Sequence, residues 1–68
     1  MLLSNGIMMK NDVIESFNAA VVNPENIHEG GGINWNFVDA DLFMDLGTIY
    51  TTEYLNDCIS VLVDNHFA

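Results

Sequence analysis

The near-absence of basic residues is the feature that most constrains how this chain can fold. Ten Asp and Glu residues accompany a single cation, Lys10, so the 68 residues have a formal net charge of −9. Because the carboxylates lack intramolecular counter-ions, solvent or another molecule must pair with them, and burying an unpaired carboxylate is costly. Half of the residues are hydrophobic, which is enough for one core. We therefore predict a single folded domain rather than an acidic disordered tail.

Residues 11 to 22 are predicted to form the first helix. Asp12 is the N-cap candidate, and Glu15, three residues later, completes a capping-box pattern. The Asn-Pro dipeptide that follows the segment ends the helix. The inward-facing residues at helical spacing are Ile14, Phe17, Ala20 and Val21.

The central segment is predicted to contain a loop, a strand and a short helix. Residues 23 to 32 form the loop, since they include three consecutive glycines, and the Lys-Ser/Thr pair of a phosphate-binding loop is missing. In residues 33 to 38, INWNFV, apolar residues alternate with Asn, which is a strand pattern. Its pairing partner is either the N-terminal segment or residues 47 to 51. Residues 39 to 46 fit a helix capped by Asp39 and ended by a glycine, but their alternating acids also fit an extended chain.

The C-terminal segment, residues 51 to 67, shows the clearest helical pattern. Thr51 or Thr52 can cap this helix, and Glu53 lies in its positively polarised first turn. The inward-facing residues are Leu55, Cys58, Ile59, Leu62 and His66, and the opposite face carries Glu53, Asp57, Ser60 and Asp64. Together these elements predict an α+β fold: a small single domain, mostly helical, with a minor antiparallel sheet of two or three strands. Residues 1 to 9 are expected to be a loosely held extension of a domain that spans residues 10 to 68.

The aromatic residues of the central segment are expected to lie in the core. A domain this small needs Trp35, Phe37 and Phe43 inside it to bury enough apolar surface. If one of them is exposed, it becomes a candidate anchor for a protein interface, because aromatic residues dominate interface hot spots.

No pattern in the sequence points to a metal site or to catalysis. In DADLFMD, Phe43 and Met44 occupy a ligand position and the glycine position of an EF-hand loop. The residues that could bind zinc show no paired ligand spacing: His28, Cys58 and His66. A cysteine on the apolar face of a helix is an unreactive thiol. We predict a protein that is not an enzyme and has no cofactor or metal.

Charge and composition also limit the partners and the location. Nucleic acids and anionic membranes are held by Lys and Arg, which this chain lacks, so neither is expected as a direct ligand. No apolar run approaches the length of a membrane span, and the N-terminus lacks the basic region of a signal peptide. With one cysteine, no intrachain disulfide can form. We expect a cytoplasmic protein that is a monomer or a small homo-oligomer.

The acidic residues themselves are the candidate site. Residues four apart on a helix lie about 6 Å from one another, and alternate residues of a strand lie about 6.6 Å apart. Either spacing is close to the separation of successive phosphates in DNA, about twice the axial rise of roughly 3.4 Å. Reversing Asp41 and Asp45 to Lys is expected to abolish partner binding and to leave the fold intact. The predicted contact residues are Asp39, Asp41, Asp45, Glu53, Asp57, Asp64 and Glu29.

In size, charge and lack of a catalytic set, the whole chain resembles the small DNA-mimic inhibitors of phages and mobile elements, in particular anti-CRISPR proteins. The resemblance implies a protein that uses its negative surface to block target-DNA binding by a type I CRISPR surveillance complex. The implied partner is a basic Cas subunit in the cytoplasm of a bacterial host. These inhibitors share no diagnostic motif, so the resemblance assigns no individual residue.

A second interpretation of the same composition is an acidic adaptor, an antitoxin-like partner or an obligate subunit of a larger assembly. Such a protein would be held in its assembly by its aromatic residues. It would expose apolar surface, and would aggregate or unfold when isolated.

Overall fold

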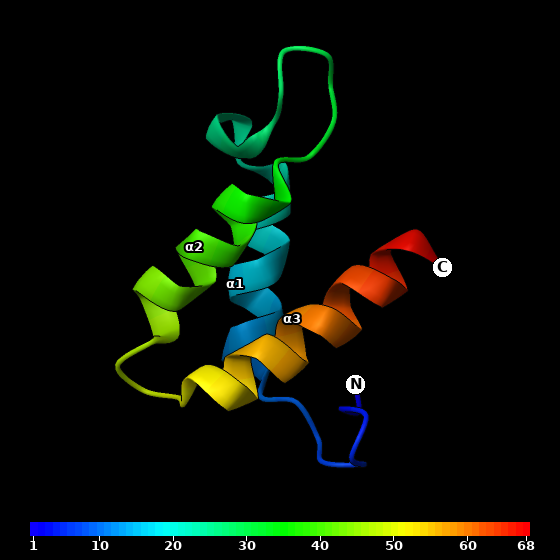
Figure 1. The fold of residues 1–68 in the computed structure, drawn as a ribbon, viewed down its shortest axis with the longest axis vertical. Coiled ribbons are helices and arrows are strands. Elements are labelled where there is room, and N and C mark those ends of the chain that lie inside the picture. Colours follow the sequence, from blue (N-terminus) through cyan, green and yellow to red (C-terminus); the bar gives the residue numbers. More distant parts are fainter.

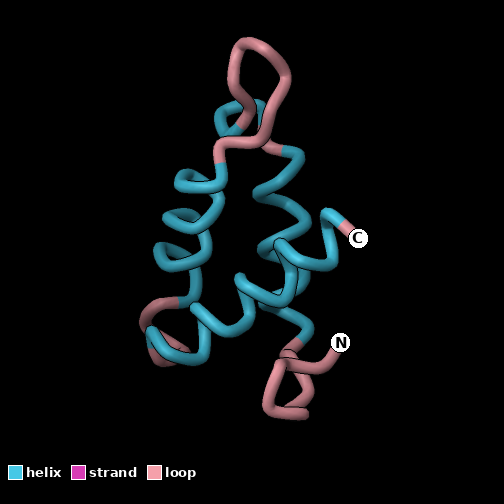
Figure 2. Tube along the Cα trace, turned by 45° about the vertical axis from the view of Figure 1, so that its right-hand side comes forward, coloured by secondary structure: helices cyan, strands magenta, loops and turns pink.

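The structure is a computed structural model that describes residues 1–68, and it contains only helices and connecting loops (Figure 1). The elements are α1 (Asn11–Val22), the short 3-10 helix η1 (Pro24–Asn26), α2 (Trp35–Leu46) and α3 (Thr52–Phe67). Helices α1 and α2 lie side by side and run in opposite directions. Helix α3 crosses them near the end where α1 begins and α2 ends (Figures 1 and 2).

The predicted α+β fold is wrong, because the chain contains no sheet. Its extended pairing consists of two isolated antiparallel bridges, Leu2 with Met8 and Ile27 with Ile33, and Figure 2 shows no strand. A bridge of one residue pair is too short to form a sheet, since even a complete two-stranded hairpin is only marginally stable in water. The fold is all-helical.

The strand predicted for residues 33 to 38 is instead the approach to α2 and its first turn. The Asn34 side chain accepts a hydrogen bond from the Phe37 backbone N–H, which caps the helix at residue 34 rather than at Asp39. A six-residue segment is short enough to fit the two-residue repeat of a strand as well as the 3.6-residue repeat of a helix. The twelve residues of α2, however, form a helix that buries Val38, Leu42 and Leu46, because residues spaced four apart share one face of a helix. The extended alternative for residues 39 to 46 is therefore also wrong. The predicted end of the helix at the glycine, residue 47, is confirmed.

Helix α1 has the predicted bounds but a different start. Its N-cap residue is Lys10, which makes no side-chain capping bond. Asp12, the predicted cap, lies within the first turn and accepts a hydrogen bond from Tyr50 instead. A carboxylate in the first turn still interacts favourably with the positive end of the helix dipole. The buried residues of α1 are Val13, Phe17 and Ala20.

Helix α3 follows the sequence prediction closely. The Thr51 side chain accepts a hydrogen bond from the Tyr54 N–H over 3.2 Å, which confirms the N-cap. Leu55, Cys58 and Leu62 are buried, and Ile59 is half-buried. His66, predicted to face inward, is exposed.

The core is small, because only 12 of 68 residues are buried. Its members come from all three helices and from the N-terminal segment, where Leu3 and Met9 are 4% and 2% exposed. Residues 1 to 9 form a tight hairpin in which the Leu3 N–H donates to the Ile7 carbonyl over 2.8 Å. Gly6 takes a φ of 84° at the turn, a conformation that few other residues adopt. The hairpin thus brings two side chains into the core.

Candidate functional site

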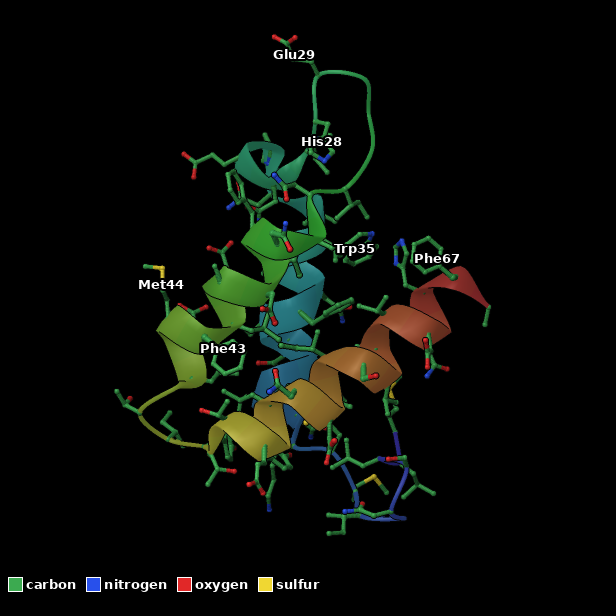
Figure 3. All side chains as sticks on the ribbon, viewed as in Figure 1. His28, Glu29, Trp35, Phe43, Met44 and Phe67 are labelled. Atoms are coloured by element: carbon green, nitrogen blue, oxygen red, sulfur yellow. The ribbon has the colours of Figure 1, made fainter.

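The structure distributes the seven predicted acidic residues over three regions. Asp45 lies on the side of α2 that faces α1, Asp41 faces η1, and Asp39 is half-buried in the first half of α2. Glu29 lies at the tip of the loop before α2, away from the helices (Figure 3). The remaining three, on the outward face of α3, are Glu53, Asp57 and Asp64.

Asp41 is held by a buried amide. The Asn26 side chain, 3% exposed, donates hydrogen bonds to Asp41 Oδ2 over 2.7 Å and to the Ala20 carbonyl oxygen over 2.9 Å. Because each N–H of a buried amide needs an acceptor, Asp41 satisfies a group that the fold depends on. Sequence reasoning missed Asn26, since an Asn after a Pro-Glu pair in a loop gives no sign of burial.

The carboxylates of Asp45 and Asp12 each accept a hydrogen bond from a hydroxyl group. Ser16 Oγ donates to Asp45 Oδ2 over 3.2 Å, and the Tyr50 hydroxyl lies 2.9 Å from each carboxylate oxygen of Asp12. Asp12 and Ser16 are four residues apart on α1, so they lie on one face of that helix. Neutral hydroxyl donors therefore stabilise the carboxylates of Asp12 and Asp45.

The acids of α3 have a different environment. Glu53 and Asp57 are four residues apart, and Asp64 is a further seven along, so all three share the face opposite the buried Leu55 and Leu62. All three are exposed, and no hydrogen bond within the protein reaches their carboxylates. Their axial rise is about 6 Å between the first two and about 10 Å between the second and third. This row of exposed carboxylates, Glu53, Asp57 and Asp64, is called the α3 acidic face below.

Glu29 is positioned by a backbone turn. The His28 N–H donates to the Gly32 carbonyl over 2.7 Å, and the Gly31 N–H donates to the His28 carbonyl over 2.8 Å. Gly31 takes a φ of 95°, which explains the need for glycine at this point of the loop. The turn separates Glu29 from the α3 acidic face (Figure 3).

The aromatic residues do not all enter the core. Trp35 is half-buried in an aromatic cluster at the end of α3, with ring centroids 5.2 Å from His66 and 5.5 Å from Phe67. Phe43 is half-buried between α2 and α3 (Figure 3). The core position predicted for Phe37 is wrong: its side chain is 53% exposed, because the helical periodicity of α2 places it outward.

Three titratable groups cluster where α3 meets the start of α1. The Tyr54 hydroxyl accepts a hydrogen bond from the Lys10 N–H over 3.0 Å, and its ring lies 5.0 Å from that of Tyr50. Partial desolvation raises the pKa of both tyrosines, and the hydrogen bond to Asp12 raises the pKa of Tyr50 further. Burial likewise raises the pKa of the Cys58 thiol. A thiol with a raised pKa is a poor nucleophile at neutral pH.

The structure contains no pocket and no group of three or more His, Cys, Asp or Glu side chains that could hold a metal ion. His28 lies on the loop, His66 packs on Trp35, and Cys58 is buried. Every helix is too short or too polar to cross a membrane. The features that could contact a partner are therefore exposed carboxylates and exposed apolar side chains.

Comparisons with known protein families, with curated proteins and with solved structures find no match to this chain.

Proposed function

We propose that this protein inhibits a nucleic-acid-binding protein by occupying its basic surface with the α3 acidic face. The observation that carries the proposal is that Glu53, Asp57 and Asp64 share one exposed face and have no donor within the protein. A carboxylate bonded to a neutral donor has one oxygen occupied, so it can accept fewer hydrogen bonds from a new partner than an unbonded one. The α3 carboxylates are free to accept hydrogen bonds from Arg and Lys, which form stronger charge-assisted bonds.

The mechanism is competition. Arg and Lys that otherwise hold phosphates bind the α3 carboxylates, and the spacing of about 6 Å between Glu53 and Asp57 is close to the separation of successive phosphates. The net charge of −9 attracts a basic surface over several ångströms and accelerates association. The same charge repels nucleic acid, so the protein contacts only the basic partner.

The preferred target is a type I CRISPR surveillance complex in the cytoplasm of a bacterial host. This choice is supported by the resemblance in size and charge to anti-CRISPR proteins. The basic Cas subunits that line the DNA channel of such a complex have the surface chemistry that the α3 acidic face requires.

The test is a comparison of two variants with equal net charge. The triple variant E53Q/D57N/D64N neutralises the α3 acidic face. The control E15Q/E25Q/E29Q removes three exposed carboxylates from α1, η1 and the loop. Inhibition of target-DNA binding by a purified type I complex is measured for each. We expect the first variant to lose inhibition and the control to keep most of it. Equal loss in both would show that overall charge, and not this face, is responsible.

A second candidate function is that of an adaptor or obligate subunit, and one observation favours it. Large hydrophobic side chains that remain exposed include Met8, Phe37, Met44, Ile49 and Phe67. An obligate subunit would aggregate or unfold in isolation, because that surface would be covered only in the assembly. Sedimentation of the isolated protein distinguishes the two: a folded, soluble species at micromolar concentration argues against the obligate subunit.

A further inference from the structure

A row of apolar side chains follows the outer side of α2. Phe37 and Met44 are 53% and 81% exposed, and Ala40 between them is also exposed. Because residues at positions i, i+3 and i+7 lie along one side of a helix, these three side chains form a single row. Figure 3 shows Met44 projecting from α2 away from the other helices. We call Phe37, Ala40 and Met44 the α2 apolar row.

Two carboxylates flank this row. Asp41 is four residues after Phe37 and three before Met44, and Asp45 is one turn further along. Asn26 and Ser16 each bond to the Oδ2 atom of their carboxylate. The Oδ1 atoms receive no hydrogen bond within the protein, although the side chains are already fixed in place. The acceptors beside the row are therefore positioned in advance for an outside donor, which lowers the entropic cost of binding.

Charge determines which occupant fits the row. A second copy of this chain would place its own Asp41 and Asp45 against the first pair, with only Lys10 to offset ten acids. An uncharged apolar segment would desolvate the carboxylates without pairing them, which is unfavourable. A helix with apolar residues on one side and Arg or Lys beside them can cover the α2 apolar row and pair with the two carboxylates at the same time. Met adapts its shape to different partners and Phe provides an anchor.

We propose that the α2 apolar row, with Asp41 and Asp45, docks a basic amphipathic helix of the target protein. This inference rests on the proposed function, since it adds a second contact to the same basic partner. Phe37 and Met44 pack against the apolar side of that helix, and its Arg or Lys side chains bond to the two Oδ1 atoms. The α3 acidic face supplies the competition with nucleic acid, whereas the α2 apolar row supplies an apolar anchor.

The test uses a synthetic peptide of Leu and Lys arranged as an amphipathic helix, with an alternating Leu-Lys peptide of the same composition as its control. Each is titrated into the isotope-labelled protein at physiological salt, and amide chemical shifts are followed. We expect the helical peptide to shift Phe37, Asp41 and Met44, and to bind at least about tenfold more tightly than the control, because isolated anchors contribute on that scale. Shifts confined to the N-terminal hairpin or to α3 would overturn the proposal.

A matched pair of variants completes the test. F37S/M44S removes the anchors of the row, and M8S/I49S removes two side chains of similar exposure elsewhere, 61% and 64%. The helical peptide should bind about tenfold more weakly to the first and unchanged to the second. Equal binding to both overturns the proposal, as does a dimer of the unaltered protein that F37S/M44S dissociates. The E53Q/D57N/D64N variant should still bind this peptide through α2, so the proposed function and this inference can fail separately.

Discussion

The side-chain amide of Asn26 connects the end of α1 to the middle of α2, because it donates to the Ala20 carbonyl and to Asp41 Oδ2 at the same time. One acidic residue of this very acidic protein thus has a structural role that its sequence does not reveal. A substitution of Asp41 is therefore expected to change the stability of the fold as well as the charge of the surface.

Asp41→Ala is expected to reduce the free energy of unfolding by about 1–3 kcal/mol, because it leaves a buried amide N–H of Asn26 without an acceptor. Asp57→Ala is the control, since that carboxylate is exposed and unbonded, and its effect should stay within about 0.5 kcal/mol. Urea denaturation measures both. Equal stability of the two variants would refute the structural role of Asp41. The reversal of Asp41 and Asp45 to Lys is accordingly expected to damage the fold, unlike the expectation from sequence.

Leu42→Ala is expected to cost about 2–5 kcal/mol, because Leu42 is fully buried among the helices. That loss is close to the whole stability of a domain this small, so the variant should be largely unfolded. Phe37→Ala should change stability little, since Phe37 is exposed on the opposite side of α2. Circular dichroism at 25 °C distinguishes them. If Phe37→Ala were the more damaging change, the outward position of Phe37 on α2 would be refuted.

Alkaline pH is expected to destabilise the protein through Tyr50 and Tyr54. Their pKa values are raised in the folded state above the ordinary 10.0, so the unfolded state releases its protons first. The stability they contribute is fully present below pH 10 and is lost as the pH rises through the folded-state pKa values. Melting temperatures of the unaltered protein and of Y50F/Y54F measure the effect. The double variant should show a smaller alkaline loss, and an identical loss would assign it to other groups, such as Cys58.

Added salt is expected to stabilise the isolated protein and to weaken its binding to a basic partner. Both effects have one cause, the screening of charges that are uncompensated within the chain. The melting temperature should rise with sodium chloride, and it should rise less for E53Q/D57N/D64N, which has less repulsion to screen. Differential scanning calorimetry over a salt series provides the measurement. A melting temperature that falls with salt would show that self-repulsion is not a significant term.

Local patterns in the sequence predicted the bounds of α1 and most features of α3. In α3, the Thr51 cap, the buried positions Leu55, Cys58 and Leu62, and the acidic opposite face all follow from helical periodicity. In α1 the bounds also follow, because Pro24 stops the helix. These features depend on residues within one or two turns of each other, which is the range over which a sequence pattern carries information.

The tertiary structure decided the rest. Residues 33 to 38 fit a strand or a helix equally well, and the helix prevails because Val38, Leu42 and Leu46 can then pack together against α1 and α3. Likewise, the acids differ in role only through residues distant in the chain: Asn26 holds Asp41, Ser16 holds Asp45, and Glu53 and Asp57 have no such partner. The net charge is a property of composition alone. Which carboxylates remain available to another molecule depends on contacts between helices, and those contacts form only when the chain packs.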